Sequence, residues 1–95
     1  MSAGLRLRPE AEADLQEASR WYESQRIGLG DEFLLEVEQG LTRIQETPRL
    51  YTEIHGNVRR SLLRRFPYGI FYIVVEDTVV VLAILHQARN PDRWP

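Results

Sequence analysis

The fold is decided by the stretch RRSLLRRFPYGIFYIVVEDTVVVLAILHQARNPDR, residues 59–93. It contains two apolar runs, residues 68–75 and 78–85, which are separated by Glu76 and Asp77 alone. Two runs rich in β-branched residues, joined by two turn residues, are typical of a β-hairpin. Both faces of these strands are apolar, whereas a sheet with one face in water alternates apolar and polar residues. Each face of the predicted sheet therefore needs a cover.

Regular alternation along a strand assigns its side chains to two faces. In the first strand we expect one face to hold Tyr68, Ile70, Tyr72 and Val74, and the other to hold Phe71, Ile73 and Val75. In the second strand we expect one face to hold Val79, Val81, Ala83 and Leu85, and the other to hold Val80, Leu82 and Ile84.

Two amphipathic helices precede this hairpin. Pro9 suits the first turn of a helix, where its missing N–H costs nothing, and apolar residues then recur at helical spacing. We expect Gly28 and Gly30 to form a turn and Asp31 to cap the second helix. Gly40 lies in the apolar stripe of that helix, which indicates a close approach of the first helix.

Two more segments complete the predicted sheet. Residues 5–8 alternate and indicate an edge strand, residues 50–57 are expected to be a loop, and residues 58–66 form an arginine-rich strand. The prediction is an α+β fold in the order β-α-α-β-β-β, forming a single domain over residues 1–95. A helical hairpin packs on one face of a mainly antiparallel four-stranded sheet. We expect the second face to be an interface, because an open apolar patch usually marks a partner site. The alternative is that strand twist and the C-terminal tail cover it.

The composition is that of an ordinary globular protein. The 95 residues are 43% hydrophobic, carry a net charge of −2 and include no cysteine, and all 12 basic residues are arginine. Residues 1–56 hold 11 acidic residues and 6 arginines, whereas residues 57–95 hold 3 acidic residues and 6 arginines. No apolar run is long enough to span a membrane and no signal peptide is visible, so we expect a cytoplasmic protein.

Few residues stand out as chemical groups. His86 ends an apolar strand and is the best-placed general acid or base; alternatively, its ring hydrogen-bonds to backbone and orders the tail. His55 lies in the predicted loop beside Glu53. Two distant histidines without cysteine are no metal signature, so we expect neither a metal nor another cofactor. The arginines could form a basic surface that binds phosphate groups or an acidic partner. Alternatively, they lie on a solvated edge strand and prevent aggregation through that edge.

Four features together resemble the RelE/ParE superfamily of bacterial type II toxins, the plasmid stabilisation proteins. They are the element order, the EADL motif of residues 12–15, VRR at residues 58–60 with FPYGIFY at residues 66–72, and VLAILHQARNP at residues 81–91. The resemblance covers nearly the whole chain, and the final motif is the most specific. It implies a cognate antitoxin whose C-terminal segment wraps the toxin, which fits an uncovered sheet face and an arginine strand.

The resemblance also implies one of two activities. ParE-type members inhibit DNA gyrase, whereas RelE-type members are ribosome-dependent endoribonucleases that cleave mRNA without a metal. The sequence favours the ParE-type gyrase inhibitor over an enzyme. It has no lysine, and Gly69 stands close to where some ribonuclease members carry an arginine. A third reading is a non-toxic relative that binds its antitoxin and does nothing else.

Candidate site residues follow from these readings. If the chain is a ribonuclease, the candidate catalytic residues are His86, Arg89, Arg60, Arg64 and Tyr72, and Tyr72 could serve as the acid only if it faces His86. For a protein partner, we expect a hetero-oligomeric complex with the antitoxin, bound through Arg59, Arg60, Arg64, Arg65, Tyr68, Tyr72, Arg89, Arg93 and Trp94.

Overall fold

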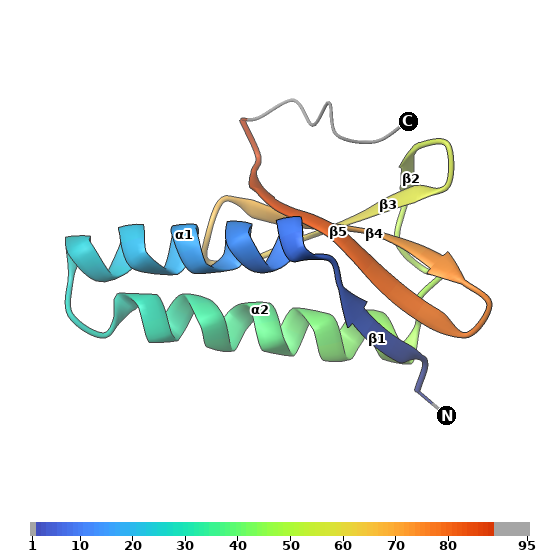
Figure 1. The fold of residues 1–95 in the computed structure, drawn as a ribbon, viewed down its shortest axis with the longest axis horizontal. Coiled ribbons are helices and arrows are strands. Elements are labelled where there is room, and N and C mark those ends of the chain that lie inside the picture. Colours follow the sequence, from blue (N-terminus) through green and yellow to red (C-terminus); the bar gives the residue numbers. More distant parts are fainter. Residues whose placement is uncertain (1, 89–95) are drawn as a thin grey trace.

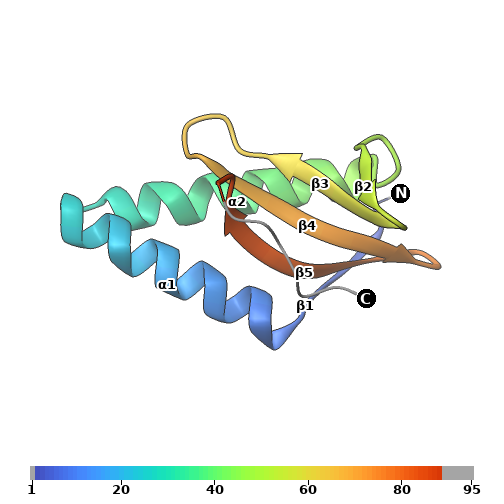
Figure 2. The ribbon, with the colours of Figure 1, turned by 90° about the horizontal axis from the view of Figure 1, so that it is seen from above.

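The computed structural model, which describes residues 2–88, has two layers: a twisted five-stranded sheet and a helical hairpin on one of its faces (Figures 1 and 2). In chain order the elements are β1 (Gly4–Leu7), α1 (Pro9–Gln25), α2 (Leu29–Glu46), β2 (Glu53–His55), β3 (Val58–Leu62), β4 (Tyr68–Val75) and β5 (Thr78–His86). The strands lie in the order β1-β5-β4-β3-β2. Strand β1 runs parallel to β5 and the other pairs are antiparallel. The predicted α+β class and the helical hairpin on one face are confirmed.

The number of strands differs from the prediction, because the sheet has five strands rather than four. The additional strand is β2, which lies within the segment expected to be a loop. It has three residues, and Ile54 is the one apolar side chain among them, so no alternation marks it as a strand. Backbone pairing with Val58 and Arg59 of β3 defines it.

The turn between the helices uses different residues from those expected. Helix α2 begins at Leu29, and Gly28 precedes it with a φ of +90°, a conformation that glycine adopts without a steric penalty. Both carboxylate oxygens of Glu23 on α1 accept a hydrogen bond of 3.0 Å, one from Gly28 N just before α2 and one from Gly30 N in its first turn. Glu23 therefore satisfies N–H groups at the start of α2, and Asp31 lies inside the helix, in its first turn, and not at its cap.

The close approach of the two helices occurs at Gly30 rather than at Gly40. A Cβ atom on Gly30 would lie 2.7 Å from the carbonyl oxygen of Ser19 on α1. A Cβ atom on Gly40 would instead meet Ile70 of the sheet, at 3.1 Å. Gly40 thus lets α2 approach the sheet, and the prediction that it faces the first helix is wrong.

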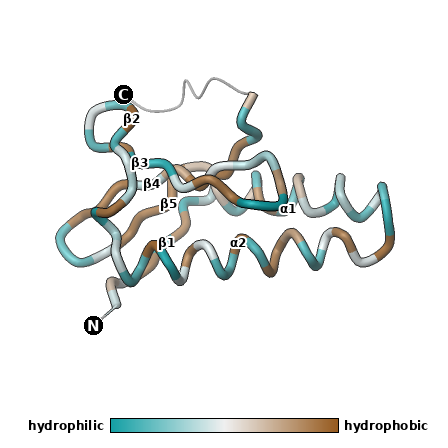
Figure 3. Tube along the Cα trace, turned by 180° about the vertical axis from the view of Figure 1, so that it is seen from behind, coloured by the Kyte–Doolittle hydropathy of each residue, from teal (hydrophilic) through white to brown (hydrophobic). Residues whose placement is uncertain are grey.

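The main core lies between the hairpin and the sheet. Apolar and polar residues follow each other along α2 at helical spacing (Figure 3). Its buried residues therefore lie on one side of the helix, which packs against the strands. An aromatic group fills the end near the helix turn, where Tyr22 and Phe33 of the helices meet Phe66 and Tyr68. The aliphatic part of this core includes Val37, Ile44, Ile70, Val79, Val81 and Ile84.

Strand β5 carries a bulge at Leu82. Phe71 of β4 pairs with Ala83, but the next residue, Tyr72, pairs with Val81, so Leu82 has no opposite residue. A single extra residue exchanges the two faces for the rest of the strand. Val81 and Ile84 accordingly both belong to the core under the helices, whereas Ala83 belongs to a second cluster.

The prediction of regular alternation in β5 is therefore wrong beyond Val81, while the faces assigned to β4 are confirmed. On β4, Tyr68, Ile70, Tyr72 and Val74 pack under the helices, and Phe71 and Ile73 lie on the opposite face. The second face carries the cluster of Val58, Phe71, Ala83 and Leu85, with Ile54, Ile73 and Leu82 packed against it.

Neither α1 nor α2 lies over this second face (Figure 2). Its four central residues are nevertheless at most 4% exposed, so the expectation of a large open apolar patch is wrong for its centre. Leu62 and Val75, at its margins, remain 46% and 48% exposed. Among the described residues, the most exposed apolar side chains of this face thus lie at its margins, while Ile54, Ile73 and Leu82 are partly buried.

Asp14 of α1 continues the hydrogen bonding of β5 where β1 ends. Val81 is the last residue of β5 that β1 pairs with, and its carbonyl accepts a hydrogen bond from Arg8 N as the chain turns into α1. Beyond this point, Ile84 N donates a hydrogen bond of 3.0 Å to Asp14 Oδ2, and both groups are buried. The carboxylate of α1 therefore satisfies a backbone donor that no strand reaches.

We expect Asp14→Ala to reduce the free energy of unfolding by about 1–3 kcal/mol, because it leaves the buried Ile84 N–H without this acceptor. Urea unfolding followed by circular dichroism measures the change. Glu12→Ala is the matched control on the same helix, since Glu12 is exposed, and it should change stability by less than about 0.5 kcal/mol. Equal losses in the two variants would contradict the role given to Asp14.

Candidate functional site

His86 ends β5 on the side of the sheet that the helices cover. It pairs with Tyr68 of β4, and the two rings meet edge to face with centroids 5.4 Å apart. Its Nδ1 accepts a hydrogen bond of 3.1 Å from Ala88 N, so the neutral ring carries its proton on Nε2. The backbone contact that was one of the two sequence-based readings of His86 is therefore present.

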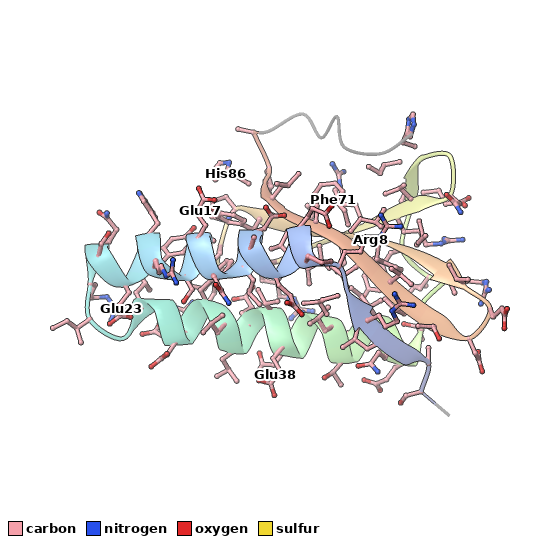
Figure 4. All side chains as sticks on the ribbon, in the orientation of Figure 1. Arg8, Glu17, Glu23, Glu38, Phe71 and His86 are labelled. Atoms are coloured by element: carbon pink, nitrogen blue, oxygen red, sulfur yellow. The ribbon has the colours of Figure 1, made fainter. Side chains whose placement is uncertain are left out.

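A cavity of about 480 Å³ lies between α1 and the end of β5, and His86 forms part of its wall. Glu17 and Trp21, one turn apart on α1, line the opposite side together with Asp14. Figure 4 shows Glu17 and His86 on the same side of the molecule. Sequence reasoning did not identify Asp14, Glu17 or Trp21 as site residues, and Trp21 is 57% exposed. Their spacing on one helix face is the signal that could have found them.

Arg60 lies on the opposite face of the sheet from His86. It pairs with Phe71, which pairs with Ala83, and residues directly opposite each other in antiparallel strands share a face. Phe71 and Ala83 belong to the cluster on the second face. The sheet therefore separates His86 from Arg60, two of the residues proposed to act together in a ribonuclease.

Arg59 has a structural role. Its side chain is 19% exposed, and its guanidinium donates to the carbonyl oxygens of Tyr51 at 2.6 Å and Arg49 at 3.0 Å and lies 3.8 Å from Glu53. These contacts attach the segment before β2, and β2 itself, to strand β3. Little of this guanidinium is left for a partner.

Arg64 and Arg65 lie beyond the end of β3 and not on a strand, which corrects the predicted extent of the arginine strand. Glu36 of α2 accepts hydrogen bonds from both backbone N–H groups, at 2.6 and 3.1 Å. The Arg65 guanidinium pairs with Glu32 at 2.7 Å, and this hydrogen bond lowers the pKa of the Glu32 carboxyl. The connection between β3 and β4 is thereby attached to α2. The exposed Arg64 guanidinium has no ion-pair partner within residues 2–88.

Tyr72 is fully buried, and its hydroxyl donates a hydrogen bond of 2.7 Å to the carbonyl oxygen of Pro48. The residue of β4 that pairs with His86 is Tyr68, so Tyr72 does not meet the condition set for it as a catalytic acid. Burial raises the pKa of Tyr72 to about 12, with a smaller opposing effect from Arg59. The buried Tyr72 hydroxyl is therefore placed neither for catalysis nor for contact with a partner. Tyr68 is partly buried and lines the cavity.

The remaining candidates, Arg89, Arg93 and Trp94, lie outside the described residues. Within residues 2–88, no three histidine, aspartate or glutamate side chains gather as a metal site would require. In the same part of the chain, neither helix has the length and apolarity needed to cross a bilayer.

Comparisons with known proteins identify the family to which this chain belongs. Residues 5–91 match the family described as ParE toxin of type II toxin-antitoxin system, parDE. The chain is 28% identical over 93 residues to Toxin ParE2 of Mycobacterium tuberculosis. The aligned residues cover 97% of this chain and 89% of that protein. The chain therefore belongs to the ParE toxin family, within the RelE/ParE superfamily of type II toxins.

Solved structures of toxin–antitoxin systems share the fold. A chain of the chromosomal ParDE TA system from P. aeruginosa superposes with a TM-score of 0.74 at 18% identity, covering 90% of this chain and 96% of that one. A chain of the intact E. coli RelBE toxin–antitoxin complex gives a TM-score of 0.70 at 17% identity, covering 93% and 100%. The fold is thus common to ParE-type and RelE-type proteins and does not distinguish them.

We expect Tyr72→Phe to lower the free energy of unfolding at pH 7 by about 0.5–1.5 kcal/mol, because the buried hydrogen bond to Pro48 is lost. Above pH 10, an unfolded tyrosine loses its proton while folded Tyr72, with its raised pKa, keeps it. Wild-type stability should therefore fall relative to the variant as the pH rises from 10 to 12.

Chemical denaturation at several pH values measures both effects. Tyr51→Phe is the control, because Tyr51 is only partly buried and forms no hydrogen bond through its hydroxyl within the described residues. A difference between wild type and Tyr72→Phe that stays constant up to pH 12 would contradict the raised pKa.

Proposed function

We propose that this chain is the toxin of a type II toxin–antitoxin system, that it inhibits DNA gyrase in the bacterial cytoplasm, and that a cognate antitoxin neutralises it. Family membership supports the toxin assignment. The observation that carries the choice of gyrase is the separation of His86 from Arg60 by the sheet. The chain then acts as a binding protein and does not cleave RNA.

Metal-free RNA cleavage needs a base, an acid and cations that stabilise the extra negative charge of the phosphorane. His86 is a candidate base, but the charged groups that line its cavity within residues 2–88 are the carboxylates Asp14 and Glu17. Tyr72 is buried elsewhere, and Arg60 lies on the other face. Carboxylates in these positions would oppose the binding of a phosphate group.

The fold shared with a RelBE complex keeps the ribonuclease as the second candidate function. In that case His86 would be the general base, and residues beyond Ala88 would have to supply the cations. A non-toxic relative that binds its antitoxin is the third candidate. Toxicity experiments separate all three.

For the antitoxin, we propose binding along the margin of the second face and the connection that follows β3. The solved relatives include toxin–antitoxin complexes, which supports a protein partner of this kind. Arg60 and Arg64 have exposed side chains without an ion-pair partner among the described residues, and Leu62 between them is 46% exposed. Two free cations flanking an apolar side chain suit an acidic amphipathic segment.

We expect His86→Ala to keep the toxicity of the chain when it is induced alone in bacteria. Replication should stop and DNA breaks should accumulate while translation continues, and parallel labelling of DNA and protein synthesis measures this. Purified gyrase should be inhibited equally by wild type and His86→Ala. Early collapse of translation, with mRNA cut at the ribosome and this activity lost in a folded His86→Ala variant, would establish the ribonuclease instead. Harmless expression of the folded wild-type chain would favour the non-toxic relative.

We expect Arg60→Glu to weaken antitoxin binding at least about tenfold, because a repulsive charge replaces an attractive one at the proposed interface. Isothermal titration calorimetry with the cognate antitoxin measures the affinity. The control is Arg20→Glu, which makes the same charge change on the exposed surface of α1. Equal affinities of the two variants would show that the antitoxin binds elsewhere.

A further inference from the structure

The cavity beside His86 combines aromatic walls with negative charge. Trp21 is 57% exposed and contacts the edge of Tyr22, with ring centroids 5.1 Å apart. Tyr68 and His86 form the facing wall. At about 480 Å³ the space is within the range of sites that take a small ligand, and it is large enough for one long side chain.

The charges of this cavity favour a cation. Asp14 and Glu17 contribute two carboxylates, and no arginine is among the described residues that line it. Asp14 is already bonded to Ile84 N, whereas Glu17 is exposed and accepts no hydrogen bond within the described part of the chain. Glu17 is also one helical turn from Trp21, so a group resting on the indole can reach the carboxylate.

A guanidinium group fits these surroundings better than other cations. It is planar and stacks on aromatic faces, and its fork of N–H donors matches a carboxylate. An ammonium group would form the ion pair but would gain less from the aromatic walls. A phosphate group would meet two carboxylates and no described cation.

We propose that the cavity formed by Glu17 and Trp21 of α1 with Tyr68 and His86 of the sheet is a socket for an arginine side chain of a polypeptide partner. The aromatic rings bind the plane of the guanidinium, and Glu17 pairs with its N–H groups. The socket lies on the helix side of the sheet, so it is separate from the arginine-bearing surface proposed for the acidic antitoxin segment. It therefore provides a second point of contact of opposite charge.

Nuclear magnetic resonance titration of the ¹⁵N-labelled full chain tests this socket directly. The probe is Nα-acetyl-arginine methylamide, and the comparison compound is the corresponding citrulline derivative, which has nearly the same shape and no charge. We expect the arginine probe to shift the indole N–H signal of Trp21 saturably, and the citrulline derivative to bind at least about tenfold more weakly, because it lacks the charge-assisted pair.

Matched variants locate the site. Glu17→Gln should weaken binding of the arginine probe about tenfold, through loss of the ion pair. Glu10→Gln, which removes an exposed carboxylate from the first turn of the same helix, should leave it unchanged. Both positions are exposed, so neither variant is expected to unfold the chain.

Three results would overturn the proposal. They are equal binding of the arginine and citrulline probes, no saturable shift at Trp21, and a shift produced by inorganic phosphate in place of the arginine probe. A fourth result that would overturn the proposal comes from a variant in which the chain's own C-terminal arginines are replaced. If the probe binds only after Arg89 and Arg93 are both changed to glutamine, the occupant is the C-terminal segment of this chain and not a partner. None of these results depends on whether the protein is toxic.

Discussion

The extra residue in β5, Leu82, is the constraint on which the positions of the candidate site residues depend. Val79 and Val81, which precede the bulge, face the helices. Beyond the bulge, Ile84 and His86 face the helices, whereas regular alternation would have placed Ala83 and Leu85 there. A strand without the bulge would place the His86 side chain on the second face, where Arg60 lies. One residue thus determines whether the histidine and the arginine can share a site. The Asp14 carboxylate bonds to the strand two residues beyond the bulge and holds this part of β5 against α1.

The bonds that the arginines form within the fold explain why their large number does not imply a phosphate site. Arg59 is occupied by two backbone carbonyls, and Arg65 by Glu32. The acidic residues that balance them are Glu53 of β2 and Glu32 of α2, so the charge asymmetry of the sequence is partly neutralised within the fold. The cavity beside His86 is lined by carboxylates in the described residues. The surface proposed for the antitoxin and the proposed arginine socket therefore carry charges of opposite sign.

Much of the fold could be predicted from the sequence, because periodicity and turn chemistry specify it. The two helices, the edge strand and the apolar hairpin all have strong patterns, and the faces of β4 follow from simple alternation. The bulge could not be predicted, since residues 79–85 are apolar throughout and a one-residue slip changes no polarity. Strand β2 is too short to show a period, and the glutamate that caps α2 lies in the preceding helix. For the candidate site, His86 was identified, but Glu17 and Trp21 were not, because residues far apart in sequence form the cavity.

The position of the His86 ring, on which the choice between a binding protein and a ribonuclease depends, is tested most directly by nuclear Overhauser effects in the isotopically labelled protein. The bulge places the ring on the helix side, so its protons should show contacts to Tyr68 and to the α1 residues that line the cavity, Ala18 and Trp21. Contacts to Phe71 or Leu62 on the second face would contradict it. In that event the histidine and Arg60 would share one surface, and the case for a binding protein over a ribonuclease would fail.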